Sequence, residues 1–187
     1  NKRVLVTGGT GFVGAHIVES LLAKGAQIRI PIHKRPGVFN SKSIETVQAD
    51  LTQYEDCLAA VKGIDYIFHA AGAVGAASVS AMDSMGAITT NLMLTARILH
   101  AAWKENVERI LIYSSSTGYP AADYPIKEEE MWNEEPHPSY FGYGWMRRYL
   151  EKIGEFVASK SSTKVAIVRP SAVYGRNDNF DTKTGHV

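Results

Sequence analysis

A glycine-rich turn near the start of the chain constrains its fold most strongly. The segment Thr7–Gly14 (TGGTGFVG) follows a short apolar run and precedes apolar residues at helical spacing. Gly8 allows a tight turn, Gly11 removes a side chain where the backbone would approach a diphosphate, and Gly14 allows helix and strand to pack closely. The helix N-terminus then offers free N–H groups and a partial positive charge. Although a glycine turn can also bind nothing, this context predicts a phosphate-binding turn formed by Gly8, Gly11, Phe12, Val13 and Gly14.

Strand-like and helix-like segments alternate along the rest of the chain. Short apolar runs are typical of strands buried in a parallel sheet, whereas apolar residues three or four apart are typical of helices. We predict six strands, at Arg3–Thr7, Gln27–Ile32, Glu45–Gln48, Ile64–Phe68, Arg109–Tyr113 and Lys164–Val168. Gly25 closes the first of the predicted helices, which span Val13–Leu22, Tyr54–Lys62, Asn91–Glu105 and Tyr143–Ser159. The alternation predicts an α/β fold, a doubly wound parallel Rossmann sheet of six or seven strands.

The two longest predicted loops follow the fourth and fifth strands. They span Gly72–Met85 and Pro120–Ser139. Long loops in a compact domain are more often functional than not, and ligands of such sheets bind at the carboxyl ends of the strands. We therefore expect the binding site at this edge.

Composition excludes several classes of function. The net charge of +1 lacks the basic excess typical of nucleic-acid binders. Cys57 is the single cysteine, and the histidines show no metal-ligand spacing, so we predict no disulfide and no metal site. No apolar run approaches the ~20 residues that span a bilayer. We expect a cytoplasmic protein that acts on a small molecule, with neither nucleic acid nor membrane as a partner.

The end of the second predicted strand bears on the choice of cofactor. An acidic residue at this position of a Rossmann fold accepts a hydrogen bond from the adenosine ribose, whereas a basic residue accommodates a 2′-phosphate. This chain has His33, Lys34 and Arg35 there, and no carboxylate until Glu45. The pattern favours NADP over NAD, with a solvated basic loop as the alternative.

Several further motifs resemble one known family. They are Asp50-Leu51, His69-Ala70-Ala71-Gly72, Asn91 at the start of a predicted helix, Ser114-Ser115-Ser116, and Arg169-Pro170 through Val173-Tyr174-Gly175. With the glycine turn, they resemble the extended short-chain dehydrogenase/reductase family of epimerases and dehydratases, along essentially the whole chain. Within it, Tyr119-Pro120 and Phe141-Gly142-Tyr143 resemble nucleotide-sugar enzymes of the GDP-fucose synthase type. The resemblance implies dinucleotide contacts at Asp50, Leu51, Ala70, Ala71, Gly72, Asn91, Tyr143, Arg147, Pro170 and Val173.

The resemblance also implies a reaction centre made of a serine, a tyrosine and a lysine four residues after the tyrosine. Ser115 and Tyr143 match the first two, but the third position is Arg147. A free tyrosine has a pKa of ~10, and a nearby cation would lower it. One helical turn places Arg147 on the same face as Tyr143. The alternative is a surface tyrosine, solvated arginines and a simple turn at the strand end.

A second departure concerns epimerisation. The cysteine and histidine that form the acid/base pair of GDP-fucose synthases correspond here to Thr117 and His186. Because a threonine hydroxyl is too weak an acid for proton exchange at carbon, this favours a simple reductase or dehydrogenase. A dinucleotide-binding module without turnover is the other hypothesis.

The resemblance also predicts how the chain is organised. Residues 1–175 would form the dinucleotide-binding domain, and residues 176–187 would begin a truncated substrate-binding region, since family members continue further. The helices Asn91–Glu105 and Tyr143–Ser159 carry more apolar surface than one sheet contact covers, and they pair across a two-fold axis in the family. We therefore expect a homodimer that binds a nucleotide sugar or a similar carbonyl or hydroxyl compound.

Overall fold

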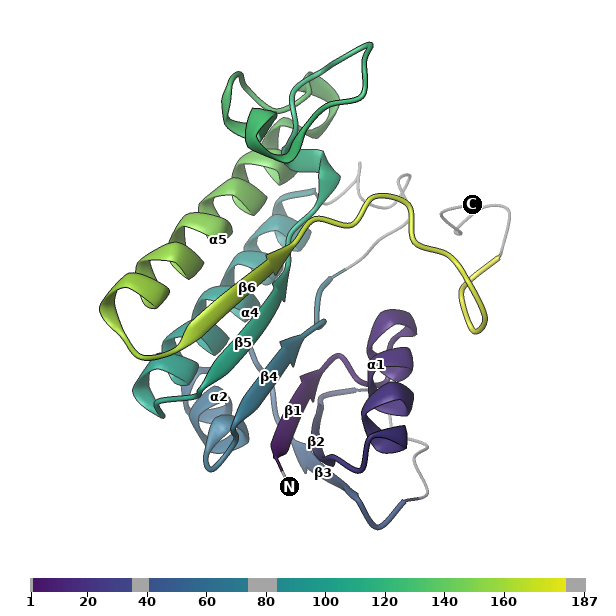
Figure 1. Ribbon diagram of the computed structural model, residues 1–187, viewed down its shortest axis with the longest axis vertical. Helices are drawn as coiled ribbons and strands as arrows, with labels where there is room; N and C mark the ends of the chain where they lie inside the picture. The colour runs from purple at the N-terminus through teal and green to yellow at the C-terminus, as the bar shows by residue number, and fades with distance from the viewer. Residues whose placement is uncertain (1, 35–40, 74–83, 181–187) are drawn as a thin grey trace.

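The computed structural model describes residues 2–34, 41–73 and 84–180, and within them six strands form one parallel sheet (Figure 1). The sheet order is β3-β2-β1-β4-β5-β6. The strands are β1 (Arg3–Thr7), β2 (Gln27–Ile32), β3 (Ile44–Gln48), β4 (Tyr66–His69), β5 (Arg109–Tyr113) and β6 (Lys164–Val168). The order reverses between β1 and β4, where doubly wound sheets bind their ligands. The predicted α/β architecture is confirmed.

Helices cover both faces of the sheet (Figure 1). Helix α1 (Phe12–Ala23) lies on one face, and α2 (Tyr54–Val61), α4 (Ser84–Lys104) and α5 (Phe141–Lys160) lie on the other. Three short 3-10 helices, η1 (Ser116–Gly118), η2 (Glu128–Trp132) and η3 (Pro138–Tyr140), lie between β5 and α5. The second long loop, Pro120–Ser139, contains η2 and the start of η3.

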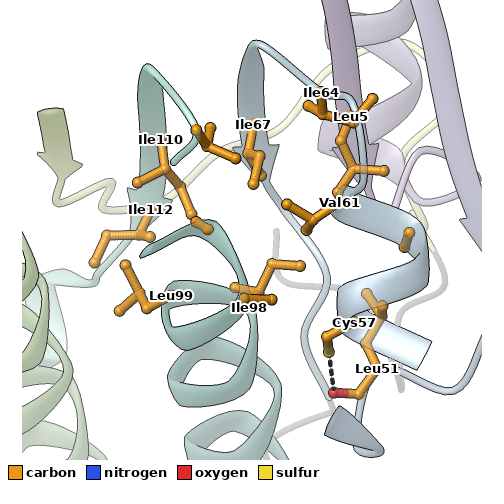
Figure 2. Packing of buried hydrophobic residues seen from close by; sticks show 14 of the residues in the cluster. Leu5, Leu51, Cys57, Val61, Ile64, Ile67, Ile98, Leu99, Ile110 and Ile112 are labelled. Atoms are coloured by element: carbon orange, nitrogen blue, oxygen red, sulfur yellow. Dashed lines mark hydrogen bonds between the residues drawn. The ribbon is translucent and has the colours of Figure 1, made fainter. Parts of the chain in front are cut away.

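Alternating side chains of the strands form two hydrophobic clusters. Val4 and Val6 of β1 pack with Val18 of α1, whereas Leu5 joins the larger cluster beneath α2, α4 and α5. Figure 2 shows this larger cluster, in which Ile67, Ile98, Leu99, Ile110 and Ile112 meet. Each fully buried side chain of this size contributes about 1.5–3 kcal/mol. The sheet is consequently a rigid platform for the segments that leave its carboxyl edge.

The end of α1 is formed as predicted. Gly25 has a φ of 74°, and its N–H donates to the carbonyl of Leu22, while Ala26 donates to Leu21. This pairing satisfies the last carbonyls of the helix and favours glycine, because the left-handed conformation strains other residues.

Several predicted boundaries are wrong, and two of them have a clear physical reason. Helix α4 begins at Ser84 rather than at Asn91, so Asn91 lies two turns inside it. The fourth strand begins at Tyr66 rather than at Ile64, which is buried in the preceding turn. In both places tertiary packing overrides a local signal. The signals were the low helix propensity of Gly86 before Asn91 and the apolar run that Ile64 extends before β4.

Candidate functional site

The glycine turn is closed by its own backbone. Gly8 has a φ of 67°, and the Gly11 N–H donates to its carbonyl over 2.8 Å. A Cβ on Gly8 would lie 2.7 Å from the Ala70 carbonyl oxygen, and a Cβ on Gly14 would overlap the Gly8 carbonyl oxygen. Gly14 therefore packs against the turn itself, where close packing against the strand was predicted.

The start of α1 is open to an anion. Gly11 caps the helix without a side-chain hydrogen bond, and its first turn contains no acidic residue. The first N–H groups of a helix have no partner within it, so Phe12 and Val13 are suited to a phosphate. A narrow backbone cradle at a positive helix end, at the reversal of strand order, fits the diphosphate of a dinucleotide.

A buried hydrogen-bond chain holds the end of β4 against this turn. The Thr7 hydroxyl accepts from the Ala71 N–H over 3.1 Å and lies 2.8 Å from Nδ1 of His69. Nε2 of His69 lies 3.1 Å from the Thr95 hydroxyl on α4. Burial, with a smaller contribution from the charge of Arg147, lowers the pKa of His69 to about 3. His69 is therefore a neutral structural link that positions Ala70 and Ala71 beside the glycine turn.

Asn91 fixes the next part of this segment. Its side-chain amide donates to the carbonyls of Ala73 and Ala87, both over 2.9 Å, and its oxygen accepts from the Ala73 N–H over 3.1 Å. A Cβ on Gly72 would lie 2.9 Å from that oxygen. Asn91 thus positions the backbone that the resemblance places beside the cofactor, and it does not cap α4.

The carboxyl edge of the sheet carries both basic and acidic side chains after β2 and β3. His33 and Lys34 are exposed after β2, while Arg35 lies outside the described residues. Oδ2 of Asp50 lies 3.9 Å from Nε2 of His33. Hydrogen bonds from the Thr52 hydroxyl and N–H lower the pKa of Asp50, with smaller contributions from His33 and Lys34. A carboxylate therefore lies beside the basic residues, which their sequence separation did not indicate.

Leu51 has a different environment from the one that its predicted adenine contact suggests. Its side chain is buried in the larger hydrophobic cluster, and its carbonyl accepts a hydrogen bond from the Cys57 thiol over 3.2 Å (Figure 2). Any adenine contact at this position would have to involve its backbone.

The predicted proton-transfer residues come from two adjacent elements. Tyr143 and Arg147 lie one turn apart on α5, and Nη1 of Arg147 donates to the Tyr113 carbonyl at the end of β5 over 3.0 Å. Ser115 follows β5 and caps η1, where its hydroxyl accepts from the Thr117 N–H over 3.2 Å. Burial lowers the pKa of Arg147, while Tyr143 opposes this shift. The arginine thus ties the helix carrying Tyr143 to the strand end carrying Ser115.

Arg148 is a structural residue that sequence reasoning missed. It is 3% exposed, and its Nε donates to the Gly118 carbonyl over 2.7 Å. Its guanidinium lies 5.1 Å from the ring centre of Trp145 and 5.6 Å from that of Trp132. The alternative of solvated arginines is therefore wrong, because Arg148 holds the turn after Ser115 against α5.

A buried ion pair braces the same region from the β6 side. Nε and Nη2 of Arg169 donate to the two carboxylate oxygens of Glu151 over 2.9 and 2.8 Å. Nη1 donates to the Tyr119 hydroxyl over 3.0 Å and to the Glu128 carbonyl over 2.7 Å. These bonds raise the pKa of Arg169. The sequence feature that could have indicated this ion pair is Glu151, a glutamate that stands two turns after Tyr143 at a buried position of the helix.

The remaining predicted residues lie around these anchors. The Pro170 carbonyl accepts from the Ser116 N–H over 3.1 Å, which places the segment after β6 beside the Ser115 turn. Val173 is exposed, and His186 lies outside the described residues. Across residues 2–34, 41–73 and 84–180, no three histidine, cysteine, aspartate or glutamate side chains gather as metal ligands. Nor does any helix in those ranges have the length and apolarity to cross a membrane.

Comparisons with known proteins agree with this geometry. The family model described as NAD dependent epimerase/dehydratase matches residues 4–187. The 3 beta-hydroxysteroid dehydrogenase/Delta 5-->4-isomerase of Mycobacterium tuberculosis (strain ATCC 25618 / H37Rv) is 39% identical, over 94% of this chain and 48% of the relative. The probable GDP-L-fucose synthase of Drosophila melanogaster is 26% identical, over 100% of this chain and 56% of the relative.

Solved structures agree as well. MoeE5 in complex with UDP-glucuronic acid and NAD has a TM-score of 0.81 at 27% identity, over 96% of this chain and 58% of that one. This chain spans about half the length of the curated relatives that it matches. The predicted resemblance is confirmed. Since the family match runs from residue 4 to residue 187, the chain belongs to the NAD dependent epimerase/dehydratase family.

Proposed function

We propose that this chain is the dinucleotide-binding part of an NAD(P)-dependent oxidoreductase. The open start of α1 carries the proposal: Gly11 caps the helix without a side-chain hydrogen bond, its first turn has no acidic residue, and it lies where the strand order reverses. Phe12 and Val13 would bind the diphosphate, and the segments after β4 and β6 would flank the nicotinamide. When bound, the cofactor supplies or accepts a hydride.

Tyr143 of this chain, assisted by Ser115, would transfer the proton that accompanies the hydride. Tyr143 gives a proton to the substrate oxygen during reduction or takes one during oxidation, while the Ser115 hydroxyl holds that oxygen. Arg147 lies one helical turn after Tyr143, so its charge stands beside the proposed site of proton transfer. Nη1 of Arg147 donates to the Tyr113 carbonyl over 3.0 Å, which fixes the guanidinium at the end of β5.

Two substrate classes follow from the relatives. MoeE5 has been solved with UDP-glucuronic acid, and a nucleotide sugar is the first candidate for this chain. A 3β-hydroxysteroid is the second, favoured by 39% identity to the steroid dehydrogenase. The exposed side chains of Phe141, Val173 and Tyr174, which lie near the carboxyl edge, also suit an apolar substrate.

For the cofactor itself we propose NADP rather than NAD. Lys34 is exposed after β2 and, with Arg35, would pair with a 2′-phosphate. The Asp50 carboxylate beside His33 is the feature that would instead favour the free ribose of NAD.

We also propose that the chain forms a homodimer through α4 and α5. Trp145 and Tyr149 lie one turn apart on α5, Phe156 lies two turns further along the same face, and all three are exposed. Trp103 of α4 contacts the Phe156 ring. A row of large exposed apolar side chains on one helix face is typical of an interface.

Replacement of Tyr143 by phenylalanine tests the proposed chemistry. Oxidation of UDP-sugars, GDP-sugars and 3β-hydroxysteroids would be followed by the absorbance of reduced nicotinamide. Tyr143→Phe should lower turnover roughly 10²–10⁴-fold and leave cofactor affinity nearly unchanged, because only the phenolic oxygen is lost. Activity close to the parent's would place the proton donor elsewhere. Cofactor binding without turnover of any substrate would favour a binding module.

A further inference from the structure

The segment after β6 is attached at both ends across the carboxyl edge of the sheet. Near its start, the Pro170 carbonyl accepts from the Ser116 N–H over 3.1 Å. At its far end, Nε2 of His16 donates to the Arg176 carbonyl over 2.7 Å. Figure 1 shows this segment running from β6 at the sheet edge towards α1. The segment therefore links the Ser115 turn to the helix that follows the glycine turn.

The attachment to α1 is made next to the phosphate cradle. His16 lies two residues after Gly14, and its ring meets the ring of Phe12 edge to face, with centroids 5.5 Å apart. A Cβ built on Gly175 would lie 3.8 Å from the Phe12 ring. The segment thus ends on the side chains that flank the proposed diphosphate site.

We propose that His16 is a positioning residue for the dinucleotide, which holds segment 170–176 across the bound cofactor and slows its release. This inference rests on the proposed cofactor binding. The two anchors lie at the proton-transfer end and the phosphate end of the site, so the segment follows the length that a dinucleotide would occupy. Departure of the cofactor from this side would require the His16 bond to open.

The His16 hydrogen bond holds segment 170–176 more directly than the neighbouring ion pair does. Nη2 of Arg176 also donates to Glu19 over 2.7 Å, but these side chains are 70% and 50% exposed. Exposed ion pairs contribute little, because water competes for both charges. The His16 bond is also exposed, but it goes to the backbone of the segment itself, and the Phe12 ring packs against the imidazole, so it fixes the main chain directly.

Cofactor release in three variants tests this role. His16→Leu removes the donor and His16→Gln offers an amide donor in its place. Arg176→Gln removes only the exposed charge pair and keeps the backbone carbonyl that His16 binds. Release of NADPH would be followed by stopped-flow fluorescence, with equilibrium affinity and the thermal unfolding midpoint measured in parallel. The loss of one hydrogen bond should raise the release rate of His16→Leu about 3- to 10-fold. The other two variants should stay within about twofold of the parent.

Three results would overturn the inference in distinguishable ways. A lowered unfolding midpoint in His16→Leu with an unchanged release rate would mean that the bond stabilises only the fold. If His16→Leu does not fold, His16→Gln becomes the test. A release rate raised 3-fold or more in His16→Gln would contradict the positioning role, because the amide donor would be present and yet would not slow release. Failure of the parent to bind NADPH or NADH would overturn the proposed function, and this inference with it.

Discussion

His69 makes the stability of the site depend on pH. Its pKa is about 3 in the folded chain and would be near 6.5 in the unfolded chain. Between these values the unfolded state binds more protons, so stability is complete above the unfolded pKa and falls as the pH is lowered towards the folded pKa. The expected slope approaches about 1.4 kcal/mol per pH unit within this window.

Replacement of His69 by asparagine tests this dependence. His69→Asn keeps polar atoms between Thr7 and Thr95 but does not titrate. Urea unfolding from pH 7 to pH 5 should show a clearly shallower fall in the free energy of unfolding for His69→Asn than for the parent. Parallel curves for the two proteins would show that His69 is not the titrating group.

Among single residues, the sequence allows a prediction for those with a fixed motif position and none for those that depend on a distant partner. Ser115, Tyr143 and Arg147 stand at fixed spacings, and the structure places them on two adjacent elements. Glu151 and Arg169 are 18 residues apart, and nothing local links them before α5 packs against β6. Asn91 was predicted from its motif, but two of its three backbone hydrogen bonds depend on Ala73, 18 residues earlier.

At the scale of the elements, the Arg169–Glu151 pair joins α5, β6 and η2. The Glu151 side chain is 2% exposed and that of Arg169 is 20% exposed. Removing one partner of such a pair costs about 3–5 kcal/mol, because the other charge is left without compensation. Glu151→Leu should therefore lower the free energy of unfolding by several kcal/mol in urea titrations.

Glu155→Gln is the matched control on the same helix. Glu155 is 53% exposed and pairs with Lys152, so its loss should cost less than about 1 kcal/mol. Equal effects of the two variants would show that the buried pair does not brace the fold.

The strands were predicted more accurately than the start of α4. The runs of β2, β5 and β6 end at turn-forming or polar residues, so their bounds could be read directly. Helix α4 begins seven residues before the predicted Asn91, because its first turns depend on tertiary contacts rather than on strong helix formers.

For the whole molecule, the exposed aromatic row on α5 predicts self-association. Equilibrium sedimentation at micromolar concentration should give a dimer for the parent and a monomer for Tyr149→Glu, because a charge would be buried in the interface. Tyr124→Gln, at an exposed tyrosine away from α5, should remain dimeric. A monomeric parent would refute the proposed dimer.

The most direct test of the account is a titration of the purified chain with NADPH and NADH. We predict saturable binding of both, tighter for NADPH. A Cβ on Gly11 would lie only 3.2 Å from the Gly8 carbonyl oxygen, so the turn must shift slightly in Gly11→Ala, and the added methyl group should obstruct the diphosphate. The thermal unfolding midpoint of this variant checks that it still folds. The loss of one charge-assisted hydrogen bond to the diphosphate costs about 1.5–3 kcal/mol of binding free energy, so Gly11→Ala should bind the cofactor roughly tenfold or more weakly than the parent. Equal affinities for the two cofactors would refute the preference for NADP. No binding of either, or parent-like binding by Gly11→Ala, would contradict a dinucleotide site on the glycine turn.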